Sequence, residues 1–265
     1  MSVVYKDALY VLGGKSEHGS YPMKLHKLDL TANPPVWSTI RAKGMAPVAR
    51  VELNACVYKD KLYVYGGEGM DDGNMAFLCD LWSFDFGKGK WKELSREGGT
   101  RRKAHGMWAA KDKLYVFGGT RVKAGAADWA LSPVRSFESF DLDTEVWESL
   151  RCVGDDPWPI AEYCMLPIYS GQEEPTSIIV FGGYHSLGGV HPRTDQDEYR
   201  EKYGEEMADF CLPYRRRLLR LDFQTMVWTK LASARVGDTP YNGTYVALPQ
   251  SERHWSHTSP GLHSP

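Results

Sequence analysis

The hydrophobic positions of the chain fall into four similar segments, each of which ends in paired glycine. These segments are Leu9–Gly14, Leu62–Gly67, Leu114–Gly119 and Ile178–Gly183. Aromatic and β-branched residues follow one another in them without alternating polar positions, which predicts a strand buried on both faces. A glycine pair predicts a backbone with positive φ that lies close to a neighbouring segment. The first glycines, Gly13, Gly66, Gly118 and Gly182, are 53, 52 and 64 residues apart, which indicates an internal repeat.

Each glycine segment is followed by an apolar-Asp-apolar triplet and then by a tryptophan. The triplets are Leu28–Leu30, Phe84–Phe86, Phe140–Leu142 and Leu221–Phe223, and the tryptophans are Trp37, Trp91, Trp147 and Trp228. The tryptophans come 8, 6, 6 and 6 residues after the aspartates, which is the length of a short hairpin. We expect each carboxylate to bind backbone N–H groups in the turn, and each indole to fill the gap between neighbouring sheets.

A further apolar segment precedes each glycine segment. These segments are Val3–Tyr5, Leu53–Tyr58, Gly106–Ala110 and Tyr163–Tyr169, and Lys-Asp turns follow the first three. One repeat therefore predicts four strands, which form one blade of a radial array.

With four ordered copies of this pattern from Val3 to about Leu248, the chain resembles the kelch-repeat family. The resemblance implies an all-β propeller of four-stranded blades, in which the first strand lines a central channel and the tryptophan strand lies outermost. The expected blades are residues 1–40, 52–94, 104–150 and 162–231, with a partial fifth at 240–248. The resemblance also implies that the protein docks partners through its loops.

The fifth unit ends after one strand, Tyr241–Leu248, and a polar tail follows at 249–265. The sequence thus predicts an incomplete or open ring, for which three interpretations remain: a fragment of a longer propeller, an unusually small ring, or an open stack that self-associates at its blade edges. We favour the fragment. The longest insertion between a second and a third strand predicts a helix at about 193–210.

Charge and cysteine content exclude several other classes of protein. The 265 residues include 32 Lys plus Arg and 34 Asp plus Glu, so the formal net charge of −2 favours neither nucleic acid nor a membrane as the partner. No apolar run approaches the roughly 20 residues of a spanning helix. Five irregularly spaced cysteines indicate reduced thiols, and we expect a cytoplasmic or nuclear protein.

Charged and aromatic residues in the predicted loops are the candidates for partner binding. They are Arg50, Glu52, Arg102, His105, Arg121, Trp129, Tyr163 and His185. Arg50 and Arg102 occupy matching repeat positions, where they are suited either to capture an acidic peptide or to pair with carboxylates inside the ring. Trp129 lies outside the repeated tryptophan position, and tryptophan is enriched in binding hot spots.

The motifs predict a noncatalytic interaction module that binds a protein or peptide. We expect no catalytic residues, cofactor or metal, because the eight histidines include no HExxH motif and no nucleotide-binding loop is present. The alternative is a metal-dependent oxidase or lyase. It rests on the family resemblance, since some kelch relatives assemble metal ligands from distant loops, and on the histidines and carboxylates in the predicted loops.

Overall fold

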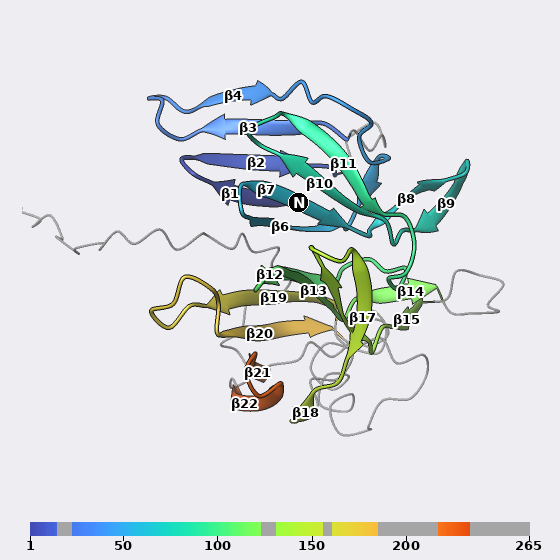
Figure 1. Cartoon of the computed structure of the whole chain (residues 1–265), viewed down its shortest axis with the longest axis vertical. Coiled ribbons are helices and arrows are strands. Elements are labelled where there is room, and N and C mark those ends of the chain that lie inside the picture. The colour runs from blue at the N-terminus through green and yellow to red at the C-terminus, as the bar shows by residue number, and fades with distance from the viewer. Residues whose placement is uncertain (15–22, 123–130, 156–160, 185–216, 234–265) are drawn as a thin grey trace, which may run out of the picture.

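The computed structural model describes residues 1–14, 23–122, 131–155, 161–184 and 217–233. This described part is built entirely of β-strands, and so contains no helix that could span a membrane (Figure 1). The predicted all-β architecture of four-stranded blades is confirmed. The predicted helix at 193–210, the fifth strand Tyr241–Leu248 and the tail at 249–265 lie outside the described residues.

Four antiparallel blades follow one another along the chain. Blade 1 contains β1 (Ser2–Tyr5), β2 (Ala8–Leu12), β3 (Leu25–Asp29) and β4 (Val36–Thr39). Blade 2 contains β6 (Asn54–Tyr58), β7 (Lys61–Tyr65), β10 (Leu81–Asp85) and β11 (Lys90–Ser95). Blade 3 contains β12 (Gly106–Ala110), β13 (Lys113–Phe117), β16 (Phe137–Asp141) and β17 (Val146–Leu150). Blade 4 contains β19 (Ala161–Ile168), β20 (Ser177–Tyr184), β21 (Arg217–Asp222) and β22 (Val227–Ser233).

The remaining strands lie beside these blades. Two small antiparallel sheets consist of β5 (Arg50–Val51), β8 (Glu68–Asp71) and β9 (Asn74–Phe77), and of β14 (Thr120–Val122) and β15 (Leu131–Pro133). Strand β18 (Val153–Gly154) pairs in parallel with the outer edge of β22. The first strands of the blades contact one another in series, β1 with β6, β6 with β12, and β12 with β19.

The register of the outer hairpin is the same in all four blades. The pairs are Leu28 with Trp37, Phe84 with Trp91, Phe140 with Trp147, and Leu221 with Trp228. The aspartate after each apolar residue accepts backbone N–H bonds within the turn, as expected: Asp85 Oδ1 from Lys88 at 2.8 Å, and Asp141 Oδ1 from Thr144 at 2.9 Å. A repeated local pattern in the sequence therefore gives a repeated local structure.

Consecutive blades pack face to face through apolar side chains. We call the face that carries the repeated tryptophan the leading face of a blade, and the opposite face its trailing face. On blade 2, Leu62, Phe84 and Trp91 of the leading face pack with Tyr10 and Leu12 of blade 1. The second such core joins Tyr63, Tyr65 and Leu81 to Leu114, Phe140 and Trp147, and the third joins Trp108, Phe117 and Phe137 to Ile178, Leu221 and Trp228. Burial of this apolar surface holds the series of blades together.

The glycine pair lies where two blades approach most closely. Gly66 has φ +61°, and a Cβ atom there would lie 2.6 Å from the backbone oxygen of Arg102 in the next blade. Gly67 has φ +96°, and its Cβ would lie 2.6 Å from the oxygen of Val51, in the segment that leads into the same blade. The N–H of Gly67 donates to the oxygen of Arg102 at 2.9 Å. The pair therefore allows a backbone hydrogen bond between neighbouring blades.

Polar contacts link the turns at the opposite end of the blades. The contacts are Lys6 Nζ to Asp60 Oδ1 at 3.6 Å, Lys59 Nζ to Asp112 Oδ1 at 2.5 Å, and the Lys111 N–H to Glu174 Oε2 at 3.2 Å. Each joins the turn of one blade to the turn of the next. The repeated Lys-Asp turns thus form a chain of links that we call the turn belt.

The leading face of blade 1 is the exception to this pattern of burial. Trp37 is 56% exposed, whereas Trp91 and Trp228 are 3% and 2% exposed. Within the described residues no blade precedes blade 1, so Trp37 packs against no neighbouring sheet. The expectation that the tryptophan fills a gap between sheets is thus confirmed for blades 2, 3 and 4, whereas the described residues place no other sheet against Trp37.

The close approach at Gly66 predicts a large and local effect of substitution. Gly66→Ala is expected to lower the free energy of unfolding by about 3 kcal/mol, because it adds a strained φ to a clash with backbone. Gly73→Ala is the matched control: Gly73 also has positive φ, but its Cβ would meet nothing within 4 Å. This control is expected to cost about 1 kcal/mol. Urea unfolding measures both, and equal losses would contradict close packing at Gly66.

Candidate functional site

The glycine pairs mark one end of the blades, which we call the glycine end. The hairpins β8–β9 and β14–β15 leave the blades there, directly after Gly67 and Gly119, and both project on the same side of the molecule (Figure 1). The segments that lead into blades 2 and 3 also reach this end, since the oxygens of Arg50 and Arg102 lie next to the first glycines of the preceding blades. Most of the predicted binding residues belong to these segments and hairpins.

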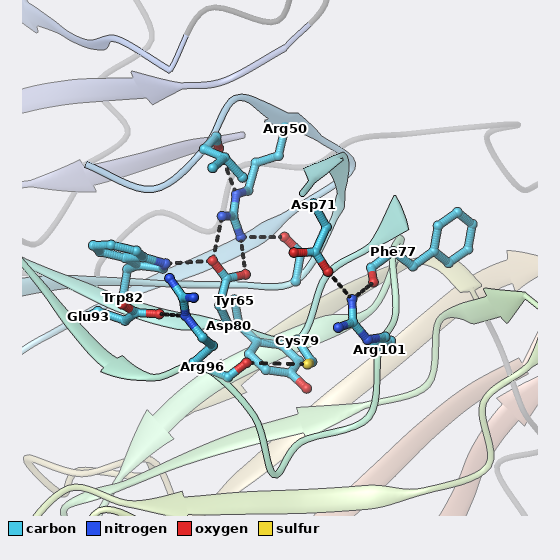
Figure 2. A network of polar contacts seen from close by, with 12 residues as sticks. Arg50, Tyr65, Asp71, Phe77, Cys79, Asp80, Trp82, Glu93, Arg96 and Arg101 are labelled. Atoms are coloured by element: carbon cyan, nitrogen blue, oxygen red, sulfur yellow. Dashed lines mark hydrogen bonds and ion pairs between the residues drawn. The ribbon is translucent and has the colours of Figure 1, made fainter. Parts of the chain in front are cut away.

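Arg50 is fully buried beneath the glycine end. Its guanidinium forms two short bonds with Asp80, from Nη1 to Oδ1 at 2.6 Å and from Nη2 to Oδ2 at 2.7 Å (Figure 2). It also donates to the oxygens of Val48 at 3.0 Å and of Gly66 at 3.2 Å. Burial tends to raise the pKa of Asp80, but the hydrogen bonds and charge of Arg50 outweigh it, and this pKa lies below its ordinary value.

Arg102 repeats this arrangement in blade 3. It donates to the oxygen of Thr100 at 3.3 Å and to that of Gly118 at 3.0 Å. These positions correspond to Val48 and Gly66 around Arg50. The charge partner is Glu138, 2.8 Å from Nη2, and the hydroxyl of Ser136 accepts a bond at 2.6 Å. Each arginine thus fastens the segment before its blade to the first glycine of that blade.

These contacts revise the expected role of both arginines. The sequence left two alternatives open, capture of an acidic peptide or pairing inside the ring, and the structure shows internal pairing for both. Both side chains have 0% exposure, so a ligand would reach them only after displacing Asp80 or Glu138. Any contribution to binding is therefore indirect, through the position of the segments that they hold.

Half-buried and exposed charges form a separate network above these buried pairs. Lys103 Nζ lies 2.7 Å from Glu68 and 3.2 Å from Glu52, and 5.0 Å from the ring centroid of Phe77. Arg101 pairs with Asp71 at 2.8 Å (Figure 2). The network joins blade 2 to the segment that leads into blade 3. It places Glu52, a predicted binding residue, at the surface of the glycine end.

His105 and Tyr163 were predicted as binding residues, and both contribute to packing. His105 is 4% exposed, and no described residue forms a hydrogen bond with either ring nitrogen. Its Cε1 lies 3.0 Å from the Cβ position of Gly66. The Tyr163 hydroxyl donates to the oxygen of Phe117 at 2.6 Å. We therefore revise both from ligand contacts to contacts between blades.

Of the remaining predicted binding residues, one is exposed at the surface and two lie outside the described residues. Arg121 is exposed on β14 at the glycine end. Trp129 and His185 lie outside the described residues. Sequence reasoning missed Asp80 and Glu138 as partners of the arginines. A signal was available for Glu138, because a carboxylate inside the apolar strand Phe137–Asp141 requires a partner when it is buried.

The described residues give no evidence of a metal centre. Within them, no three His, Cys, Asp or Glu side chains lie close enough together to hold a metal ion. The described cysteines, Cys56, Cys79, Cys152 and Cys164, are free thiols, and burial raises the pKa of Cys56 to about 12. At neutral pH Cys56 is thus protonated and packs as a small hydrophobic residue.

Comparison with known proteins gives a family match over most of the chain. The model of the KLHDC2/KLHL20/DRC7 Kelch-repeats domain matches residues 1–248. The solved structure of YjhT is similar with a TM-score of 0.59 at 18% identity, over 90% of this chain and 65% of that one. At this identity the structural likeness supports the fold alone.

The curated relatives match at low identity and differ in kind. The N-(sulfonatooxy)prop-2-enimidothioate sulfolyase of Thlaspi arvense is 31% identical over 159 residues, which are 58% of this chain and 43% of that protein. Leucine-zipper-like transcriptional regulator 1 of Pongo abelii is 29% identical over 206 residues, 76% of this chain and 23% of that protein. The chain thus spans less than half the length of these curated relatives.

The two arginines of neighbouring positions 101 and 102 provide a matched test of burial. Arg102→Ala is expected to lower the free energy of unfolding by about 3–5 kcal/mol, because Glu138 would remain buried without its partner. Arg101→Ala removes a pair whose side chains are 51% and 41% exposed, and is expected to cost less than about 1 kcal/mol. Urea unfolding of the two variants measures the difference. Similar losses would contradict the structural role given to Arg102.

Burial of His105 predicts a pH dependence of stability. Burial, and then the positive charge of Arg102, lowers the pKa of its imidazole well below the ordinary value. The unfolded chain takes up this proton near pH 6.5, while the folded protein does not. Neutral His105 thus makes its full contribution to the free energy of unfolding above about pH 6.5. Below this pH the free energy of unfolding falls by up to about 1.4 kcal/mol per pH unit.

Variants separate this effect from that of other groups. His105→Leu is expected to flatten the fall in unfolding free energy between pH 6.5 and 5, since Leu53 holds the corresponding place beside Gly13. His26→Gln, a control on β3 of blade 1, is expected to leave that fall in place. An unchanged pH profile for His105→Leu would show that His105 is not its source.

Proposed function

Because the chain belongs to the kelch-repeat family, we propose that it is a noncatalytic module that binds a partner protein or peptide at its glycine end. The main support for the proposal is the contrast at this end between a buried layer of side chains and an exposed layer above it. Arg50 and Arg102 are buried and fully engaged below, while variable hairpins present exposed side chains above. Variable loops on a rigid repeat scaffold are a common basis for recognition.

The exposed layer combines an apolar side chain with charges of both signs. Met70 in the hairpin β8–β9 is 44% exposed, and Asp72 beside it is exposed. Arg121 is exposed on the neighbouring hairpin. A flexible thioether is suited to irregular apolar partner surfaces, and charges around it fix the orientation of the partner. These residues are thus the proposed contacts.

The buried layer keeps the contact residues in place. Gly66 is held by Arg50 from below and packs against the segment of Arg102. The hairpin β8–β9 follows directly from this glycine pair, and Arg101 also binds the backbone oxygen of Phe77 at its end, at 3.0 Å. A loop that is ordered before binding loses less conformational entropy when the partner arrives. The arginines therefore support affinity without touching the partner.

A second candidate function is a metal-dependent oxidase or lyase. Its support is the 31% identity to a sulfolyase over 58% of this chain. The test is elemental analysis of the purified full-length chain after incubation with copper or iron and removal of free metal. Stoichiometric bound metal would favour the enzyme, and its absence would remove the candidate.

The interaction proposal predicts that surface changes at the glycine end abolish partner binding without loss of stability. Met70→Asp combined with Arg121→Glu is expected to reduce recovery of specific partners at least about tenfold in quantitative affinity purification, since central contacts dominate binding energy. Lys88→Glu is the control: its side chain is 78% exposed in the turn between β10 and β11, at the opposite end. Thermal unfolding verifies that each variant is folded.

Two results would contradict the proposed binding surface. If the double variant recovers the same partners as the unaltered chain, the glycine end is not the binding surface. If Lys88→Glu alone abolishes recovery, the surface lies at the opposite end of the blades instead.

A further inference from the structure

The hairpin β8–β9 carries two methionines that stand directly opposite each other. Met70 pairs with Met75, and Glu68 pairs with Phe77 two residues further from the turn. Residues that stand opposite each other in an antiparallel pair share one face of the sheet, and so do residues two apart along one strand. These four side chains therefore lie on one face of the hairpin, which we call the methionine face.

A tight turn fixes the arrangement of this face. Its central residues, Asp72 and Gly73, have φ values of +47° and +82°. Two positive φ values in a two-residue connection are typical of a type I′ turn, whose twist matches that of the strands on either side. The turn therefore sets the register that places Met70 opposite Met75. Both thioethers are held together before any partner arrives.

Lys103 holds the base of the methionine face. Its Nζ lies 2.7 Å from Glu68 and 5.0 Å from the ring centroid of Phe77. Phe77 is buried and Met75 is half-buried, whereas Met70 is 44% exposed. Exposure therefore increases from the base of the hairpin toward its turn, and Met70 is the accessible member of the methionine pair.

The other methionines of the described ranges are either less exposed or lie elsewhere. Met107 is 3% exposed in the core between blades 2 and 3. Met45 is 71% exposed, but it follows Lys43, which forms a β-bridge with Lys90 of the outer strand of blade 2. Of these exposed methionines, Met70 is the one that belongs to a hairpin of the glycine end.

An exposed thioether is open to oxidation by peroxide. Hydrogen peroxide transfers one oxygen atom to the sulfur as its O–O bond breaks, and its other oxygen leaves as water. The sulfur loses two electrons, which the peroxide gains, and the apolar side chain becomes a polar sulfoxide. Methionine sulfoxide reductases reverse the step: the sulfoxide oxygen leaves as water while two thiols of the reductant are oxidised to a disulfide.

We propose that Met70 and Met75 form an oxidation site, at which peroxide stops partner binding at the glycine end and sulfoxide reduction restores it. The inference rests on the proposed function, in which Met70 is the apolar contact of the exposed layer. A sulfoxide oxygen that is buried against an apolar partner surface loses its hydrogen bonds with water, which weakens binding. Met75 shares the same face, so its oxidation adds a second polar group there.

Peptide mass spectrometry of the full-length chain after exposure to hydrogen peroxide tests the site directly. Met70 is expected to be oxidised at least about tenfold faster than Met107, because oxidation follows exposure and the core excludes peroxide. Met45 is the exposed reference and is expected to be oxidised rapidly as well. Met107 that stays reduced verifies that the blades remain folded. Similar rates at Met70 and Met107 would overturn the proposal.

Quantitative affinity purification measures the effect of oxidation on binding. The chain is oxidised, catalase removes the peroxide, and partners are then added. The oxidised chain is expected to recover specific partners at least about fivefold less than the reduced chain. Treatment with methionine sulfoxide reductases and dithiothreitol is expected to restore recovery.

Variants of the chain locate the effect of the oxidant. Met70→Leu combined with Met75→Leu removes both thioethers from the methionine face, and its recovery of partners is expected to be the same before and after peroxide. Each variant is compared with itself, so a change in its own affinity does not enter the comparison. Met45→Leu is the control, and peroxide is expected to lower its recovery as much as that of the unaltered chain.

The outcomes also separate this inference from the proposed function. If Met70→Asp combined with Arg121→Glu loses partner recovery while the oxidised chain does not, the oxidation site is wrong and the binding surface stands. If neither loses recovery, both are wrong. Equal sensitivity to peroxide in the double leucine variant and the unaltered chain, or protection by Met45→Leu, would place the oxidised group elsewhere and overturn the inference.

Discussion

The structure depends on the burial of the leading face of each blade by the blade before it. A four-stranded sheet with apolar residues on both faces is not stable alone, so Leu62, Phe84 and Trp91 become a core only when Tyr10 and Leu12 lie opposite them. The glycine pair permits this approach at one end of the blade. The arginines then hold the incoming segment at the distance that the glycines allow.

Sequence alone predicted the parts of the fold that arise from local patterns. The aspartate turns and the tryptophan register need only a few consecutive residues, and they appear in all four blades. The surroundings of Trp37 were not predictable in this way. Its local pattern is the same as that of Trp91, and the difference in burial comes from whether another blade of the described residues lies against the indole.

The candidate site was harder to predict because its contacts join distant positions. Arg50 and Asp80 are 30 residues apart, and Arg102 and Glu138 are 36 apart, so only the topology brings them together. Arginines at matching repeat positions in predicted loops suggested exposed ligand contacts. The segment instead turns inward against the next glycine pair. The prediction for His105 was wrong for the same reason. Its side chain lies beside Gly66 at the position that the apolar residue Leu53 occupies beside Gly13.

The two ends of the blades are held by interactions of different physical character. At the glycine end the pairs are buried, with Arg50 and Arg102 at 0% exposure, and dissolved ions have little effect on them. The turn belt is exposed, with Lys6 and Asp60 at 70% and 72%, and mobile ions screen such pairs. Rising ionic strength therefore weakens the ion pairs of the turn belt and leaves the buried pairs at the glycine end in place. The apolar cores between the blades are not weakened by this screening, so salt removes polar links at one end without separating the sheets.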